Sequence, residues 1–223
     1  MIDNLNKYFD HSLLTSETDH HAIIKLCREA VENDFYGIAI NPCWVTQAHR
    51  ELSGAPVKII SVAGFPLSAN TTAIKIAEAV RAVEDGADEI DMVANIGWMV
   101  SGEYDKVEDE ISQVRKHLPK ECLLKVIIET PKITPTIRDT AVEAIVNAGA
   151  DYAKTATGFF GGATTDDVAG LYKAASGRIK VKASGGIRTL GDTLAMIEAG
   201  AQRIGSSASV NIMNEYLAIR SRH

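Results

Sequence analysis

The sequence predicts an α/β protein, a single-domain (β/α)8 TIM barrel, and three observations lead to this prediction. The chain has 223 residues, 46% of them hydrophobic and 23% charged, which is typical of a globular protein. Short apolar runs alternate with longer amphipathic segments from end to end, and such alternation indicates a parallel sheet. No stretch rich in Pro, Gly or Ser divides the chain, so we expect one domain over residues 1–223.

Eight strand–helix units follow one another along the chain, which is the number found in α/β barrels of roughly 200–250 residues. The expected strands cover residues 7–10, 36–40, 57–63, 88–94, 122–129, 151–156, 179–184 and 202–206. The expected helices cover residues 19–33, 42–53, 71–86, 103–117, 135–148, 164–176, 189–199 and 208–220.

A weak internal repeat supports this order of elements. Three expected helices end in related tetrapeptides just before a strand: Asp85-Gly86-Ala87-Asp88, Ala148-Gly149-Ala150-Asp151 and Ala199-Gly200-Ala201-Gln202. Each glycine can adopt the left-handed conformation that closes a helix, so the repeat indicates helix ends at these three positions.

An open, doubly wound sheet is the alternative to the barrel. A dinucleotide-binding sheet of that type normally carries GxGxxG after its first strand. Here the first strand continues into Asp10-His11-Ser12-Leu13-Leu14, which contains no glycine. We therefore favour the barrel, whose functional residues lie on the loops at the C-terminal ends of the strands.

Charge and targeting features exclude several classes of protein. Lys and Arg number 23 and Asp and Glu number 29, and the net charge of −6 argues against a nucleic-acid partner. The first residues lack the basic and then apolar segments of a signal peptide, and no apolar run approaches the roughly 18 residues of a membrane span. We expect a soluble, cytoplasmic protein without a membrane partner.

Cysteine and histidine residues give no sign of a metal site. The three cysteines, Cys27, Cys43 and Cys122, have no CxxC spacing, which fits thiols in a reducing cytoplasm. Cys43 follows the second expected strand, where it either packs as a thiol or faces the mouth of a pocket, and we favour packing. The histidines show no metal-ligand spacing, so we expect no catalytic metal.

Charged residues occur inside the expected strands, at positions that alternate with apolar ones. Because the apolar positions must pack beneath the helices, the residues between them point into the barrel. The charged interior set in the middle strands is Glu89, Asp91, Lys125, Glu129, Lys154 and Lys182. Such side chains are almost never fully buried unless they are paired. They form either a structural ion-pair network or an active site, and the convergence of three lysines with acids favours the active site.

The composition of this set indicates carbonyl chemistry. A lysine amine is a nucleophile only when deprotonated, and its usual pKa of about 10.4 makes that form rare at neutral pH. Burial and a neighbouring ammonium both lower the pKa. The amine can then form a Schiff base, while a carboxylate or second amine moves protons during carbon–carbon cleavage. Lys154 and Lys182 lie on adjacent strands and suit the nucleophile and its partner, but alternation does not say which of them attacks.

Glycine-rich segments follow the last expected strands, where barrels frequently bind phosphate through backbone amides. The strand at 179–184 leads into Gly185-Gly186-Ile187-Arg188, and the last strand leads into Gly205-Ser206-Ser207. A third segment, Thr157-Gly158-Phe159, follows the strand at 151–156. Ordinary turns also use glycine, but the position after the last two strands favours a phosphate site.

Several segments of the chain resemble the deoxyribose-phosphate aldolases, which are class I aldolases with a (β/α)8 fold. The segments are Asp10-His11, YGIAINPCWV at 36–45, VAGFPLSANTT at 62–72, DEIDMVANIG at 88–97, LKVIIET at 124–130, YAKTATGFFGGAT at 152–164, VKASGGIRT at 181–189 and RIGSSAS at 203–209. They span nearly the whole chain in order, and AKTATGF together with VKASGGIRT is a specific pair.

The resemblance implies reversible cleavage of 2-deoxy-D-ribose 5-phosphate to acetaldehyde and D-glyceraldehyde 3-phosphate. It implies that Lys154 forms the Schiff base, that Lys182 perturbs it and takes part in proton transfer, and that Asp91 relays protons with the help of water. The residues expected to bind the substrate or its phosphate are Lys125, Gly158, Gly185, Gly186, Gly205 and Ser207. No metal or organic cofactor is implied, and the expected partners are a small phosphorylated sugar or aldehyde and, as a homodimer, a second copy of the chain.

The chain departs from the family pattern at three places. Ala39 stands where some members carry a cysteine, the segment 131–135 lacks the usual glycine, and DHSLLTSET lacks the lysine common after the first strand. None of these departures touches Lys154, Lys182 or Asp91. Two alternatives stay open: another class I aldolase or transaldolase with a different donor, and a sugar-phosphate-binding barrel without chemistry, in which the lysines bind the anion.

Overall fold

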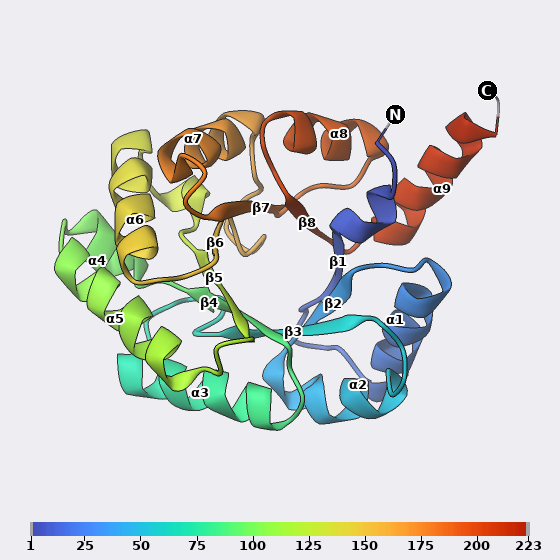
Figure 1. The fold of residues 1–223 in the computed structure, drawn as a ribbon, viewed down its shortest axis with the longest axis horizontal. Helices are drawn as coiled ribbons and strands as arrows, with labels where there is room; N and C mark the ends of the chain where they lie inside the picture. The colour runs from blue at the N-terminus through green and yellow to red at the C-terminus, as the bar shows by residue number, and fades with distance from the viewer. Residues whose placement is uncertain (1, 222–223) are drawn as a thin grey trace.

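Eight parallel strands form a closed barrel in the computed structural model, which describes residues 2–221 (Figure 1). Each strand pairs with its neighbours in chain order, and β1 pairs with β8 to close the sheet. The predicted barrel is confirmed, and the open doubly wound sheet is excluded. Of the domain expected over residues 1–223, residue 1 and residues 222–223 lie outside the described residues.

The helices surround the barrel and follow the strands in alternation (Figure 1). The strands are β1 (Phe9–Leu13), β2 (Gly37–Ile40), β3 (Lys58–Ala63), β4 (Glu89–Val93), β5 (Leu123–Ile127), β6 (Tyr152–Lys154), β7 (Lys180–Ser184) and β8 (Arg203–Ser206). The α-helices are α1 (His20–Glu32), α2 (Val45–Glu51), α3 (Thr72–Glu84), α4 (Ile96–Val100), α5 (Tyr104–His117), α6 (Pro135–Asn147), α7 (Thr165–Ala175), α8 (Leu190–Glu198) and α9 (Ser209–Arg220). Within residues 2–221 no helix combines the length and the apolarity needed to cross a membrane.

The hydrophobic core lies between the strands and the surrounding helices. Ile90 and Met92 of β4, Val126 of β5 and Val181 of β7 all belong to this core and are fully buried. These are the positions that alternation assigns to the outside of the barrel. The residues between them are consequently left to fill the barrel interior.

The strand register brings charged residues of the interior to the same height. Asp91 of β4 is the register partner of Lys125 in β5, and Lys154 of β6 is the partner of Lys182 in β7. Parallel neighbours in register point their side chains to the same face of the sheet, so both pairs face the barrel interior.

The predicted helix ends at the repeated tetrapeptides are confirmed. Gly86, Gly149 and Gly200 have positive φ values of 115°, 78° and 113° just beyond the ends of α3, α6 and α8. Each glycine therefore turns the chain from a helix towards the next strand.

The first strand differs from its prediction. The sequence predicts a strand at 7–10, whereas Leu5–Tyr8 form the 3-10 helix η1 and the strand is Phe9–Leu13. The run from Asp10 to Ser12 lacks the apolar alternation of an ordinary strand because Asp10 forms ion pairs inside the barrel. The polar residues therefore concealed the strand from a hydrophobicity pattern.

Short helical segments also differ from the predictions. The helix expected at 42–53 is divided into the 3-10 helix η2 (Pro42–Trp44) and α2. Helix α4 was not expected; it begins where the Asn95 side chain accepts a hydrogen bond from the backbone N–H of Trp98. Strand β5 ends at Ile127 rather than at residue 129, because Glu129 has a left-handed backbone and leads into the 3-10 helix η3 (Thr130–Lys132).

Candidate active site

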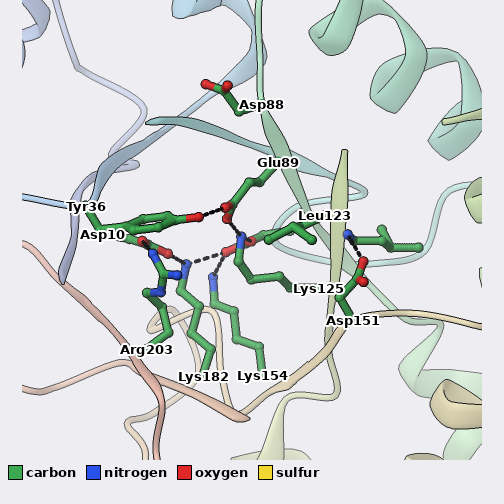
Figure 2. Close-up of polar contacts among 12 residues, drawn as sticks. Asp10, Tyr36, Asp88, Glu89, Leu123, Lys125, Asp151, Lys154, Lys182 and Arg203 are labelled. Carbon is green, nitrogen blue, oxygen red and sulfur yellow. Dashed lines mark hydrogen bonds and ion pairs between the residues drawn. The ribbon is translucent and has the colours of Figure 1, made fainter. Parts of the chain in front are cut away.

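Asp91 of β4 lies at the centre of the charged cluster inside the barrel. Its Oδ1 accepts a hydrogen bond from Lys125 Nζ at 2.8 Å, and its Oδ2 accepts one from Lys154 Nζ and one from Lys182 Nζ, each at 2.7 Å. The three lysines reach this carboxylate from the neighbouring strands β5, β6 and β7, and their amines converge in Figure 2. The interior convergence predicted from alternation is therefore present.

A second group of residues extends the cluster beneath Asp91. Asp10 of β1 is paired with Lys182 and, at 3.2 Å, with Arg203 of β8. Glu89 of β4 lies 2.5 Å from Lys125 Nζ and accepts a hydrogen bond from the Tyr36 hydroxyl. Figure 2 shows these residues linked in a continuous series of polar contacts across the barrel.

Tyr36 and Arg203 close this series on one side. The guanidinium carbon of Arg203 lies 3.2 Å from the centroid of the Tyr36 ring, a stacked cation–π contact. Neither residue is predicted as a site residue from the sequence, where Asp10 is named only in the first strand and in a family motif. The signal for Arg203 was nevertheless present, since its neighbour Ile204 is an outward core residue and places Arg203 inward.

Lys154 and Lys125 differ in their proton affinity although both are buried. Burial lowers the pKa of Lys154 to about 8, because the attraction of Asp91 is opposed by the positive charges of Lys182 and Lys125. Burial also disfavours the charge of Lys125, but Asp91 and Glu89 outweigh it and raise its pKa. Lys154 consequently has an accessible neutral form near neutral pH, whereas Lys125 stays protonated.

The central carboxylates are held in their ionised form. Burial alone would raise the pKa of Asp91, but Lys125, Lys154 and Lys182 overcome it and hold the pKa well below its usual range. The pKa of Asp10 is likewise lowered, since Lys182, Lys125 and Arg203 outweigh its burial. Buried charges of this kind persist because they are paired and hydrogen-bonded.

A pocket of about 300 Å³ opens above Lys154, at the C-terminal ends of the strands. Its walls come from the loops after β1, β6, β7 and β8. The pocket is lined by Lys154 and by all five glycine and serine residues expected to bind phosphate, namely Gly158, Gly185, Gly186, Gly205 and Ser207. Lys125 and Lys182 are fully buried and do not line it. The structure thus places Lys125, expected as a substrate contact, beneath the pocket.

Two glycines allow the backbone segments around the pocket to approach one another. A Cβ atom on Gly185 would lie 3.1 Å from the carbonyl oxygen of Gly161 and 3.3 Å from the Cα of Gly158. A Cβ atom on Gly205 would lie 2.9 Å from the Cβ of Ser184 and 3.2 Å from the Cε of Lys182. Side chains at these positions would push the loops apart or displace Lys182.

Cys43 lies apart from this arrangement. Cys43 is exposed and does not line the pocket, so the packed thiol favoured from the sequence is wrong. Within residues 2–221, no three or more His, Cys, Asp or Glu side chains are grouped so that they could hold a metal ion.

The family model described as DeoC/LacD family aldolase matches residues 5–214. The chain belongs to this family. The match covers all eight strands and every residue of the cluster and pocket described above.

Curated relatives agree with the family model over nearly the full chain. A deoxyribose-phosphate aldolase of Clostridium kluyveri is 48% identical over 212 residues, which cover 95% of this chain and 97% of the relative. A deoxyribose-phosphate aldolase of Streptococcus equi subsp. equi is 46% identical over 216 residues, covering 96% of this chain and 98% of the relative.

Solved structures of aldolases in this family share the fold. The aldolase QR15 superposes with a TM-score of 0.93 at 40% identity and covers 98% of both chains. The deoxyribose phosphate aldolase of Aeropyrum pernix, described as a tetramer, has a TM-score of 0.88 at 29% identity and covers 96% of this chain and 92% of its own. The resemblance inferred from the sequence motifs is confirmed.

Proposed function

We propose that this chain catalyses the reversible cleavage of 2-deoxy-D-ribose 5-phosphate into acetaldehyde and D-glyceraldehyde 3-phosphate, with Lys154 forming the Schiff base. One observation carries the choice of lysine. Among the three interior lysines, Lys154 is the one that lines the pocket, and its pKa is lowered to about 8. The names of the relatives support the choice of substrate.

The reaction begins when the neutral amine of Lys154 attacks the C1 aldehyde of the open-chain sugar. Loss of water from this adduct gives a protonated Schiff base, whose positive nitrogen can accept an electron pair. Lys182 favours the attack, because its nearby charge disfavours protonation of the Lys154 amine.

Carbon–carbon cleavage then breaks the bond between C2 and C3. The C3 hydroxyl loses its proton, C3 becomes the aldehyde carbon of glyceraldehyde 3-phosphate, and the bonding electrons pass to the Schiff-base nitrogen to give an enamine. A proton added to C2 gives the imine of acetaldehyde, which water hydrolyses to release the product and Lys154. Asp91 accepts hydrogen bonds from both Lys154 and Lys182, so we assign to Asp91 the transfer of these protons through water.

The phosphate group occupies the part of the pocket bounded by the loops after β6, β7 and β8 in this proposal. Four of the five residues expected to bind phosphate come from these loops, the fifth, Gly205, lies in β8, and all five line one pocket with Lys154. Backbone N–H groups in such loops donate hydrogen bonds to phosphate oxygens, and glycine lets the anion approach them closely.

Reduction with borohydride in the presence of deoxyribose 5-phosphate tests this proposal, because it converts an imine into a stable secondary amine. We expect peptide mass mapping to find the adduct on Lys154, and we expect Lys154→Met to lose both the adduct and turnover. Lys116→Met, which removes an exposed lysine of α5, is the matched control and should keep both. No adduct on Lys154, or turnover that survives in Lys154→Met, would contradict the mechanism.

The same measurement distinguishes the two alternatives. A barrel that only binds a sugar phosphate would bind deoxyribose 5-phosphate without forming any adduct. With an aldolase that uses a different donor, borohydride would trap an adduct of dihydroxyacetone in preference to one of acetaldehyde. We expect acetaldehyde to be trapped and to support synthesis of the five-carbon sugar phosphate from glyceraldehyde 3-phosphate. The homodimer stays a prediction.

A further inference from the structure

Glu129 follows the last residues of β5 and combines two features that cost free energy. Its side chain is fully buried, and Oε1 has no hydrogen-bond partner among residues 2–221. Its backbone has φ 52° and ψ 63°, a left-handed conformation that is unfavourable for a residue with a Cβ atom. Such costs persist only where the surrounding structure holds the residue in place.

The backbone around Glu129 contains an additional residue relative to β6. The N–H of Ile128 donates to the carbonyl of Lys154 at 3.1 Å, and the N–H of Thr130 donates to the carbonyl of Thr155 at 2.9 Å. Two steps along the first segment therefore match one step along the second, as in a β-bulge. A bulge changes the direction of the side chains that follow, so the alternation of β5 does not continue through Glu129.

The redirected carboxylate is bonded to the loop between β6 and α7. Glu129 Oε2 accepts a hydrogen bond from the backbone N–H of Thr157 at 3.0 Å. Thr157 and the next residue, Gly158, both line the pocket, whereas Glu129 does not. The Cα of Gly158 in turn lies against Gly185 of the phosphate-binding loops, as shown by the 3.3 Å approach of a Cβ built on Gly185.

The loop contact depends on the acceptor oxygen of Glu129. Burial raises the pKa of Glu129 and outweighs the hydrogen bonding of Thr157 and the positive charges of Lys154 and Lys132. A carboxyl oxygen accepts a hydrogen bond from a backbone N–H in either protonation state. Glu129 Oε2 therefore holds the N–H of Thr157 whether or not the side chain is ionised.

We propose that Glu129 is a positioning residue that fixes Thr157 and Gly158 against the Gly185 loop, and thereby determines the preference of the enzyme for a phosphorylated sugar. This inference rests on the proposed function, because it assumes that the pocket receives the phosphate of deoxyribose 5-phosphate. Glu129 acts through the loop and does not contact the substrate. Its loss should consequently weaken binding of the phosphate end without disabling Lys154.

Steady-state kinetics with deoxyribose 5-phosphate and with unphosphorylated deoxyribose test the proposal. Glu129→Met fills similar space but has no acceptor oxygen, so we expect KM for the phosphorylated sugar to rise by about tenfold or more. We expect kcat/KM for deoxyribose and borohydride trapping of acetaldehyde on Lys154 to change less than about twofold, because neither aldehyde uses the phosphate site. Glu129→Gln keeps an acceptor oxygen and should restore most of the preference.

Equal losses of kcat/KM with the two sugars would indicate general damage and overturn the proposal. An unchanged KM in Glu129→Met would also overturn it, and so would a Glu129→Gln variant that is as impaired as Glu129→Met. If Glu129→Met does not fold, Glu129→Gly provides the same comparison, since glycine adopts φ 52° without steric cost.

The wild-type protein separates this test from the proposed function. Absence of an adduct or of turnover in the wild type contradicts the aldolase reaction itself, whereas a normal wild type with unaltered Glu129 variants contradicts only the role of Glu129.

Discussion

The three interior lysines have three different environments within this barrel. Lys125 contacts the carboxylates of both Glu89 and Asp91, Lys182 contacts those of Asp10 and Asp91, and Lys154 contacts Asp91 alone. The lysine with one carboxylate partner is also the one at the pocket. A second carboxylate therefore accompanies the raised pKa of Lys125, and a single one accompanies the lowered pKa of Lys154.

The lowered pKa of Lys154 leads to a prediction about the pH dependence of Schiff-base formation. Only the neutral amine attacks an aldehyde, so the rate should rise as the pH rises through about 8 and level off above it. The rate at which the borohydride-trapped acetaldehyde adduct forms, measured from pH 6 to 10, gives the midpoint of this rise. A midpoint near the ordinary lysine value of 10.5 would show that the cluster does not perturb Lys154.

Sequence reasoning found Asp91 and the three lysines because each occurs in a regular alternation with mainly apolar residues of its strand. It did not identify Tyr36 or Arg203. Alternation with Ile204 places Arg203 inward, but the contacts that give both residues their roles are with residues far along the chain. Arg203 meets Asp10 only after β8 has closed on β1. The charge environment that distinguishes Lys154 from Lys182 likewise depends on the relative positions of four strands, which the order of residues does not specify.

Helices α3 and α5 are joined by a fully buried ion pair on the outer side of the barrel. Lys75 Nζ lies 2.9 Å from Glu110 Oε2 and donates a hydrogen bond to the carbonyl of Val93 at 2.8 Å. Glu110 also accepts a hydrogen bond from the N–H of Asn95 at 3.1 Å. The pair thus ties two helices to the end of β4, the strand that carries Asp91.

Breaking this pair from one side should destabilise the fold strongly. Glu110→Leu leaves the Lys75 amine buried without its carboxylate, so we expect the free energy of unfolding in urea to fall by about 3–5 kcal/mol. The double variant Lys75→Met with Glu110→Leu removes both charges and should recover most of this loss. Arg178→Ala, which breaks an exposed pair with Glu143, should cost far less than Glu110→Leu, because solvent screens that pair. A double variant as unstable as the single one would mean that the pair itself stabilises the helices.

Longer elements were predicted more reliably than short ones for a physical reason. An amphipathic helix such as α3 repeats its apolar face over several turns, so the pattern identifies it without any other information. Helix α4 has five residues and depends on one cap, Asn95, rather than on a repeated face. The bulge at Glu129 depends on pairing between β5 and β6, and a single sequence carries no sign of it.

The distribution of charge over the whole molecule combines an acidic total with a cationic interior. The net charge is −6, yet Lys125, Lys154, Lys182 and Arg203 all lie inside the barrel. Their partners include Asp10, Glu89 and Asp91, and the pairing of β1 with β8 brings Asp10 to Lys182 and Arg203. Closure of the barrel and ionisation of these carboxylates therefore support one another.

This coupling predicts a loss of stability in acid. The folded-state pKa values of Asp10 and Asp91 are lowered from 3.8, so the unfolded chain binds more protons than the folded chain at pH values below about 3.8. The stabilising contribution is present above 3.8 and is lost as the pH falls through the folded-state values. Urea unfolding at a series of pH values should show the free energy of unfolding falling over this range.

Asp10→Asn should flatten that dependence, because it removes one of the two carboxylates whose ionisation is linked to folding, although it also lowers stability at neutral pH. Glu143→Gln should leave the slope almost unchanged, since the pKa of Glu143 is lowered only by an exposed pair with Arg178 that solvent screens. If Asp10→Asn kept the wild-type slope while lowering the stability equally at every pH, Asp10 would contribute packing alone, and the link between barrel closure and ionisation would have to be abandoned.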